Sequence, residues 1–411
     1  MENPKIRFKG FTKDWEQRKL NEVGVVIDPH PSHRAPKEEQ GGIPFIGIGD
    51  VDEMGNINRE SARPVPENVY DEHHKRYDLN VPSLGLGRVA SLGKVIRLRS
   101  DIGKYAISPT ISVLQFSENI NIDYLYAYMN TPQFKKQFEG KSNGSTRQSV
   151  GTEMVRLLNL SMPFNLDEQK AIGTFYKNLD NLITLHQRKC EQTKKLKKYM
   201  LQKMFPQNGA KVPEIRFYGF TYDWEQRKLK EIADKVSEKN KNNEFSEPFT
   251  NSAEQGIISQ KDYFDREIVN NENLDSYYIV RNDDFIYNPR ISVMAPVGPI
   301  NRNRLGRNGV MSPLYTVFRT HDIDNLYLEF YFKTTKWHRF MKLNGDSGAR
   351  FDRFTISSTQ FMEMPIPYPM LDEQRKIGEY FDSLDNLITL HQRKCDELKK
   401  MKKYMLQNMF I

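Results

Sequence analysis

Apolar residues recur at alternating steps of three and four along two long stretches of this chain, residues 166–205 and 371–410. This spacing places them on one face of an α-helix. Neither stretch has an interior proline, and Pro163 in one case and Pro367 and Pro369 in the other lie just upstream, where a helix should begin. Each stretch therefore predicts one helix of about 35 to 40 residues.

The two stretches are copies of each other. At a constant offset of 205 they agree at 28 of 40 positions, including the unbroken run LDNLITLHQRKC. A helix of this length is too long to be covered by one small domain, so we expect each copy to bury its apolar face against the other as a coiled coil. The residues expected at that contact are Ile172, Leu179, Leu182, His186 and Leu196 in the first copy and Ile377, Leu384, Leu387, His391 and Leu398 in the second.

A second, shorter repeat opens each half of the chain. The segment IRFKGFTKDWEQRKL, residues 6–20, returns as IRFYGFTYDWEQRKL, residues 215–229, with 13 of 15 positions identical. The chain is thus a tandem repeat in which an opener and a long helix enclose a block that differs between the halves. We expect a first variable domain at residues 1–165, a helix at 166–205, a linker at 206–214, a second variable domain at 215–370 and a second helix at 371–411.

Both variable blocks have a mixed α/β pattern. The first has strand-like segments at residues 41–55 and 92–116, a helical spacing at 122–140 and a loop of small polar residues at 141–151. The second repeats this plan, with strands expected within residues 283–300 and 309–319, a helix at 326–344 and a loop at 345–357. The predicted fold class is α+β, with two mixed domains of one architecture joined by two long helices.

Composition restricts the class of protein. Hydrophobic residues make up 38% of the 411 positions and charged residues 28%, and there is no apolar run long enough to cross a bilayer. The N-terminal sequence lacks the apolar core of a secretory signal. Cys190 and Cys395 occupy equivalent places on the two helices, which favours reduced core thiols and a cytoplasmic location over a disulfide framework.

The net charge of +8 favours a polyanionic partner. Part of the excess lies in lysine clusters at residues 194–198 and 399–403, which either contact phosphates or complement the C-terminal ends of the helices. The sequence gives little support for a catalytic function. There is no GxxxxGK[ST] loop, and the adjacent His73 and His74 lack nearby cysteines and HExxH spacing, so neither a catalytic residue nor a metal site is predicted.

Arginine and small polar residues recur in the loops that link the expected strands. Arginine can read guanine, glutamine can read adenine, and serine or lysine can anchor phosphates. Each of these residues could equally be an exposed, solubilising side chain. The candidate DNA contacts are Arg88, Lys94, Arg97, Arg99, Lys104, Ser145, Thr146, Arg147 and Gln148 in the first block and Arg290, Arg302, Arg304, Arg307, Ser347, Arg350 and Arg353 in the second.

The opener RFKGFTKDWEQRKL, the segment PFNLDEQKAIGTFYKNLDNLITLHQRK and their return around two dissimilar blocks resemble the DNA-specificity subunit of type I restriction-modification systems. The resemblance covers essentially the whole chain. It implies two target-recognition domains, each reading one half of a split, asymmetric sequence in double-stranded DNA. It also implies that the long helices pair antiparallel, fix the half-site spacing and dock two methyltransferase subunits.

The same resemblance implies where the chemistry resides. S-adenosylmethionine would bind to the methyltransferase subunits, which methylate adenine, and ATP and magnesium to the restriction and translocation subunits, so this chain itself would hold no cofactor. Antiparallel pairing about a pseudo-dyad predicts that His186 lies near His391 and Cys190 near Cys395. The alternatives are a stand-alone DNA-binding scaffold or repressor, a protein adaptor with incidental basic loops, and an enzyme active on its own.

Overall fold

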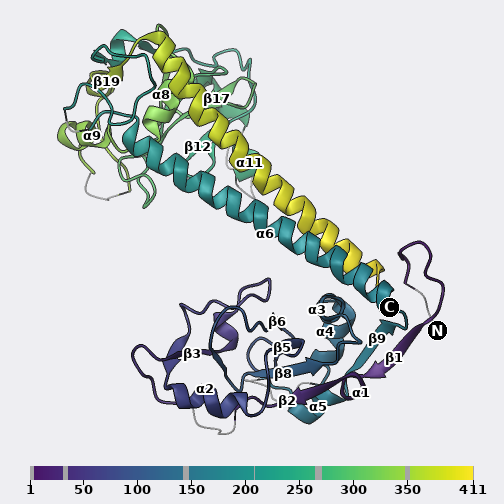
Figure 1. Ribbon diagram of the computed structural model, residues 1–411. Helices are drawn as coiled ribbons and strands as arrows, with labels where there is room; N and C mark the ends of the chain where they lie inside the picture. Colours follow the sequence, from purple (N-terminus) through teal and green to yellow (C-terminus); the bar gives the residue numbers. More distant parts are fainter. Residues whose placement is uncertain are drawn as a thin grey trace. The chain divides into compact units, whose positions relative to one another are not determined.

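The computed structural model describes residues 4–30, 36–141, 148–207, 209–263, 271–347 and 352–410. The chain divides into two compact units (Figure 1). Unit 1 comprises residues 1–188 and 392–411, and unit 2 comprises residues 189–391. Each unit therefore contains one variable block together with part of both long helices.

Unit 1 is built on a four-stranded antiparallel sheet with the order β2-β8-β5-β6, accompanied by the sheet β4-β3-β7 and the ribbon β1-β9. Its strands are β1 (Trp15–Lys19), β2 (Gly24–Ile27), β3 (Ile43–Ile46), β4 (Arg63–Val65), β5 (Ser83–Gly87), β6 (Val95–Arg97), β7 (Ala106–Ile107), β8 (Ile111–Phe116) and β9 (Asn159–Pro163). Its shorter helices are α1 (Leu20–Val23), α2 (Glu67–His74), α3 (Ile122–Met129), α4 (Pro132–Glu139) and α5 (Thr152–Arg156).

Unit 2 repeats this plan with the sheet β11-β18-β15-β16, the ribbon β10-β19 and the pairs β12-β13 and β14-β17. Its strands are β10 (Glu225–Lys228), β11 (Ala233–Lys235), β12 (Phe249–Ser252), β13 (Gly256–Ser259), β14 (Tyr278–Val280), β15 (Phe285–Tyr287), β16 (Ile300–Arg302), β17 (Gly309–Met311), β18 (Thr316–Thr320) and β19 (Pro365–Tyr368). Its shorter helices are α7 (Gln260–Tyr263), α8 (Asn325–Phe332), α9 (His338–Asn344) and α10 (Ser358–Met362). The expected α+β class, with two mixed domains of one architecture, is confirmed.

One expectation about the short helices was wrong. The helical spacing over residues 122–140 predicted a single helix, but the chain forms α3 and α4, and residues 326–344 likewise form α8 and α9. In unit 1 the break occurs at Thr131, whose hydroxyl accepts a hydrogen bond from the Phe134 amide at 3.2 Å and caps α4. Pro132 follows as the first helical residue, a position where its missing N–H costs nothing.

The two long helices are α6 (Leu166–Lys203) and α11 (Leu371–Asn408), and within each unit they run antiparallel (Figure 1). In unit 1, Leu179 and Ile183 of α6 share a buried core with Leu398 of α11. Lys402 forms an ion pair with Asp180 at 2.5 Å. Unit 2 has the equivalent pair, Lys197 with Asp385, at 2.5 Å. The expected antiparallel packing of the repeated helices is therefore found in both units.

The packing face is narrower than the sequence indicated. Leu182 and Leu387 are each 43% exposed and Leu196 is 45% exposed, so they do not lie in the buried contact as expected, whereas Ile183 is 1% exposed. The apolar stripe is wide enough to have two flanks, and the paired helices cover only one of them. His186 and His391 belong to different units, as do Cys190 and Cys395, so their proximity stays a prediction.

The end of each long helix closes the core of the unit that holds the other repeat. Phe410, after α11, packs in unit 1 against Trp15, Tyr124 and Tyr176, with ring centroids 5.5–6.1 Å apart. Phe205, after α6, is fully buried in unit 2 and lies 5.6 Å from Tyr327. Large aromatic side chains contribute much of a core's stability. Each variable block therefore needs a residue that comes from the other half of the chain.

A buried ion pair joins each opener to the start of its long helix. The Arg7 guanidinium donates two hydrogen bonds to the Glu168 carboxylate, at 2.6 and 2.9 Å, and the Trp15 indole N–H donates to the same carboxylate at 3.3 Å. The next residue, Gln169, accepts from the Asn121 amide at 3.0 Å and donates to the Pro163 carbonyl at 2.9 Å. The first turn of α6 is thus fixed to the opener, to β9 and to the cap of α3.

Unit 2 contains the same joint. Arg216 donates to Glu373 at 2.6 and 2.8 Å, the Trp224 indole donates to Glu373 at 3.1 Å, and Gln374 accepts from the Asp324 amide at 2.9 Å. We define the Arg7–Glu168–Trp15 and Arg216–Glu373–Trp224 groups as the helix joints. Because their residues are identical in both repeats, they hold the variable block on its helix in the same way in each unit.

Among the described residues, none of the helices combines the length and apolarity needed to cross a membrane.

A pair of histidines is packed under the sheet β4-β3-β7 of unit 1. His73 in α2 is fully buried, and its Nε2 lies 2.8 Å from Nδ1 of His30. Burial lowers the pKa of His73 to about 4, and repulsion from His30 and His74 adds to this effect. In the folded protein at neutral pH, the His73 ring is therefore neutral, so the two histidines can pack together.

The first prediction concerns the helix joints. Glu168→Ala removes the acceptor of Arg7 and Trp15 and leaves a mostly buried guanidinium without its carboxylate, which should lower the free energy of unfolding by ~3 kcal/mol. Asp167→Ala is the matched control, because Asp167 is on the same helical turn with a side chain 79% exposed, and its effect should stay below ~1 kcal/mol. Urea denaturation measures both variants. Equal losses would show that the joint does not stabilise unit 1.

The second prediction concerns pH. The pKa of His73 is about 4 in the fold and ~6.5 in the unfolded chain, so the unfolded chain binds a proton first as the pH falls. Stability should therefore decrease between pH 6.5 and 4, by ~2 kcal/mol at pH 5. Urea denaturation from pH 7.5 to 5 should show a shallower dependence for His73→Gln than for the wild type. His321→Gln, at a histidine with a side chain 42% exposed, should retain the wild-type dependence. A wild-type slope in His73→Gln would refute the assignment.

Candidate nucleic-acid interface

The strand-linking loops of unit 2 are joined in pairs. The loop between β15 and β16 lies against the loop that follows α9, where the Phe354 amide donates to the Pro289 carbonyl at 2.7 Å and the Ile291 amide donates to the Asp352 carbonyl at 3.0 Å. Arg290 and Arg353 face each other in an isolated antiparallel bridge. Two groups of candidates from distant parts of the sequence therefore form one surface.

Unit 1 has the equivalent arrangement. The loop between β5 and β6 meets the segment before α5, where Val89 pairs with Ser149 and the Val150 amide donates to the Arg88 carbonyl at 3.0 Å. Gln148 is exposed next to this pairing. Arg88 and Gln148, 60 residues apart in the sequence, thus belong to one loop pair. We call the joined loops of each unit its paired loops: residues 88–94 with 148–150 in unit 1, and residues 288–299 with 345–347 and 352–357 in unit 2.

Some candidates cannot be placed. Ser145, Thr146, Arg147 and Arg350 lie outside the described residues. The described neighbours Gln148, Ser347 and Arg353 lie in the paired loops, and Gln148 and Arg353 are exposed.

Several candidate arginines bind carboxylates within their own unit. Arg97 pairs with Asp123 at 2.6 Å and with Asp180 of α6 at 3.4 Å, and it stacks over the Tyr126 ring at 3.6 Å. Arg88 pairs with Asp28 at 2.8 Å. The side chain of Arg97 is only 21% exposed. The Arg97 pair with Asp180 fixes the sheet of unit 1 against its long helix, and a role of Arg88 and Arg97 in DNA binding stays a prediction.

The equivalent strand end in unit 2 carries a larger network. Arg302 binds Asp283 at 2.9 Å and Glu329 at 2.8 Å, and its side chain is 11% exposed. Arg304 binds the same Glu329 at 2.8 Å and Asp382 of α11 at 2.9 Å. Like Arg97 in unit 1, this cluster connects the end of a sheet strand to the long helix. The sequence could not distinguish such arginines from those that are available to a ligand.

The remaining candidates are more accessible. Arg99 pairs with Asp101, Lys104 with Glu67 and Arg307 with Glu247, and the side chains of these three cations are 48–58% exposed. Exposed pairs of this kind contribute little to stability, so a phosphate can replace the carboxylate at small cost. Lys94 donates to the Val51 carbonyl. Arg290 is exposed and forms no ion pair with any other described residue.

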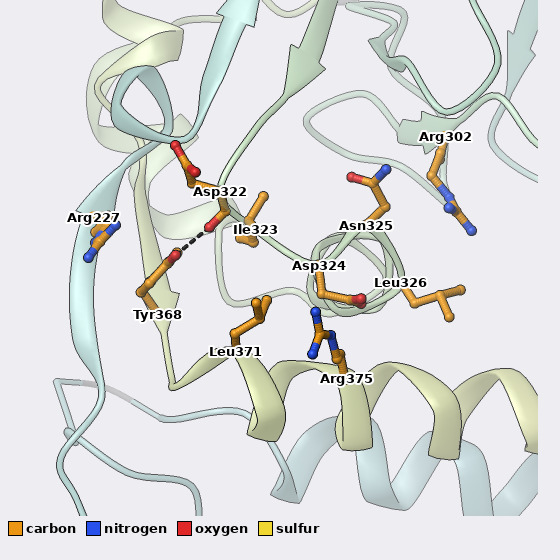
Figure 2. A pocket seen from close by; sticks show the side chains of 10 residues that line it. All are labelled: Arg227, Arg302, Asp322, Ile323, Asp324, Asn325, Leu326, Tyr368, Leu371 and Arg375. Carbon is orange, nitrogen blue, oxygen red and sulfur yellow. Dashed lines mark hydrogen bonds between the residues drawn. The ribbon is translucent and has the colours of Figure 1, made fainter.

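Unit 2 also has a hollow beside the first turn of α11 (Figure 2). Its lining mixes the cations Arg227, Arg302 and Arg375 with Asp322 and Asp324. Arg227 stacks on the Tyr368 ring at 3.9 Å, and the Tyr368 hydroxyl donates to the Asp322 carbonyl, as Figure 2 shows. Within the described part of the chain, no group of three or more His, Cys, Asp or Glu could hold a metal ion. The hollow is a mixed-charge surface at the foot of the recognition block.

The sequence analysis missed two exposed residues in the paired loops of unit 2. Val293 is 98% exposed and Met294 is 72% exposed. Residues 283–300 were interpreted as strands, and an apolar pair inside a strand segment is ordinarily buried. The signal that could have distinguished them is their position in the middle of the segment. Val293 lies three residues after Arg290, and both residues lie between the end of β15 and the start of β16.

Comparison with known proteins gives relatives along nearly the whole chain. One is the type I restriction enzyme MjaVIII specificity subunit of Methanocaldococcus jannaschii, 24% identical over 322 residues, which cover 74% of this chain and 73% of the relative. The putative type I restriction enzyme MjaX specificity subunit of the same organism is 26% identical over 426 aligned positions, covering 96% and 92%.

A solved structure has the same fold. The crystal structure of the type I restriction-modification system S subunit from M. genitalium matches 100% of this chain and 99% of its own, with a TM-score of 0.60 at 14% identity. The family described as type I restriction modification DNA specificity domain matches twice, over residues 12–195 and 222–400. These two matches contain both paired-loop surfaces and most of each long helix, and the chain accordingly belongs to the type I restriction-modification DNA specificity family.

Proposed function

We propose that this chain is the subunit that selects the DNA sequence for a type I restriction-modification complex, with each unit reading one half of a bipartite, asymmetric site. The observation that carries the proposal is the repetition of one sheet order with different loops. The orders β2-β8-β5-β6 and β11-β18-β15-β16 match strand for strand, while the paired loops differ in sequence. Equal frameworks with unequal loops are suited to reading two different half-sites.

The charge of the accessible residues supports a duplex as the ligand. The paired loops of unit 2 carry Arg290 and Arg353 next to each other, and the net charge of the chain is +8. Arginines bind phosphates and guanine edges, and phosphate contacts set the orientation while base contacts carry the specificity. The joined long helices would then fix the interval between the half-sites, which a flexible tether would not do.

The uncovered flank of the long helices supports the docking of partner subunits. Leu182, Leu185, Leu196 and Tyr199 of α6 are 43–49% exposed, and the residues 205 positions later, Leu387, Leu390, Met401 and Tyr404 of α11, are 43–58% exposed. Within each group the residues are three, eleven and three positions apart, which places all four on one face of the helix. We define these eight residues as the outer seam. Since the same seam occurs once on each helix, its occupants would be two copies of one protein, the methyltransferase subunit.

The chemistry in this proposal belongs to the partners. The methyltransferase subunits would bind S-adenosylmethionine and methylate adenine at N6, and restriction subunits using ATP and magnesium would cut unmodified DNA. This chain would supply the sequence selection and the spacing. A stand-alone repressor remains the alternative, and it would bind one duplex sequence tightly without any partner.

The third prediction tests the function. The chain, purified with its methyltransferase subunits, should methylate adenines only within one split sequence of two unlike halves at a fixed gap. Sequencing of methylated adenines across a genome exposed to the complex measures this directly. Exchange of residues 24–163 for the block of a relative should change one half of the sequence and leave the other half unchanged. Methylation without sequence preference, or none at all with active methyltransferase subunits, would refute the proposal.

The fourth prediction tests the outer seam. Leu390→Asp places a charge at one copy of the seam and should leave one methyltransferase subunit bound per chain, with the second bound roughly tenfold more weakly or worse. Leu185→Asp combined with Leu390→Asp should abolish binding of both. Thr389→Asp, at an exposed polar position on the same turn, is the control. Native mass spectrometry counts the bound subunits, and unchanged stoichiometry in the double variant would exclude the seam as the docking surface.

A further inference from the structure

An apolar tip projects from the paired loops of unit 2. Val293 and Met294 are adjacent, and both are more exposed than any apolar residue of the outer seam, at 98% and 72%. Single exposed apolar residues are common on protein surfaces and require no explanation. This pair differs from them in two ways: its backbone is held rigidly, and cations stand at its base.

The backbone holds the tip in one conformation. Ser292 and Ala295 exchange both of their backbone hydrogen bonds, at 3.1 Å each, so Val293 and Met294 are the two central residues of a tight turn. Ala295 is 6% exposed and Val297 is fully buried, and the Tyr287 hydroxyl donates to the Val297 carbonyl at 2.9 Å. The tip therefore presents both side chains without a further loss of loop entropy on binding.

Two exposed arginines lie at the base of the tip. Arg290 and Arg353 face each other in the bridge that joins the two loops, and both are exposed. Two aspartates lie in the same paired loops: Asp352, whose carboxylate is 4.0 Å from the Arg353 guanidinium, and Asp346, which pairs with Thr355 in a second bridge. Cations that flank a short apolar projection can bind phosphates on both sides of a groove while the projection reaches the base edges.

We propose that Val293 and Met294 are specificity-determining residues of the second unit and contact thymine methyl groups in the major groove of its half-site. The inference rests on the proposed function. In an intact duplex, the thymine 5-methyl group is the apolar feature that the major groove displays on base edges. Insertion between base pairs would instead require unstacking, and that form of contact is an outcome of the test below.

Among the described residues of unit 1, the loop between β5 and β6 forms no equivalent tip. In its loop between β5 and β6, Val89 lies in the bridge to Ser149, and Leu92 packs against the core of unit 1. Ala90 has a φ of +66°, so the loop turns by a different backbone conformation. The two units therefore differ in the apolar contact that they can make with DNA. The half-site of unit 1 serves as an internal control.

The experiment uses the complete methyltransferase complex and DNA that contains its methylation sequence. Each thymine is replaced in turn by uracil, which lacks only the 5-methyl group, and kcat/KM for methylation is measured. For the wild type we expect a loss of about fourfold for each contacted methyl in the half-site of unit 2. The variant Val293→Ser with Met294→Gln removes both methyl-bearing ends, should lose a similar factor on thymine DNA and should no longer respond to uracil at those positions.

The outcomes separate the inference from the proposed function. If uracil has no effect in the half-site of unit 2, or the same effect on wild type and variant, the inference is overturned while sequence-specific methylation stands. If 2-aminopurine fluorescence shows tip-dependent unstacking, the contact is an insertion and the proposal is likewise overturned. If the wild-type complex shows no sequence-specific methylation, the proposed function itself fails. Val25→Thr, at a 62% exposed valine of β2, controls for loss of exposed apolar surface and should behave as wild type.

Discussion

The core of each unit is completed by a helix end from the other half of the chain. Phe410 is surrounded by aromatic rings of unit 1, and Phe205 occupies the equivalent place in unit 2. Neither recognition block can bury its core with its own half of the sequence alone. This exchange of helix ends explains why two blocks of dissimilar sequence are kept between two nearly identical helices, since each helix must fit both its own block at one end and the other block at the opposite end.

The sequence predicted the repeated framework well because it depends on periodic burial. The long helices, the mixed α/β blocks and the antiparallel packing within each unit follow from apolar spacing, duplicated segments and the family resemblance. The same spacing could not show which flank of the helix is covered. Ile183 is buried and its neighbour Leu182 is exposed, although both fit a stripe with a period near 3.6 residues. A contact between two helices uses one narrow seam, and the choice of seam depends on the partner helix.

The candidate site was less predictable from sequence, for a different physical reason. Arg97, Arg302 and Arg290 look alike as basic residues near strand ends. The first two bind carboxylates that lie 26 or 27 residues away in the sequence, Asp123 and Glu329, and are largely covered. Arg290 is exposed because its loop turns outward at the bridge to Arg353. Ion pairs over such separations depend on tertiary contacts, which composition and local pattern do not contain.

The residues that are identical in the two repeats and the residues that differ lie in different parts of the structure. The helix joints use identical residues, because Arg, Trp and Glu must meet in one buried geometry whose disruption would leave a charge without its partner. The two members of each loop pair meet through backbone hydrogen bonds at their bases, which place few demands on the side chains at the tips. A new side chain at a loop tip therefore changes the contact with DNA without disturbing the attachment of the paired loops to the rest of the unit. The rigid turn that presents Val293 and Met294 is one result of that freedom, and in unit 1 the same freedom produced a loop that folds back onto the core.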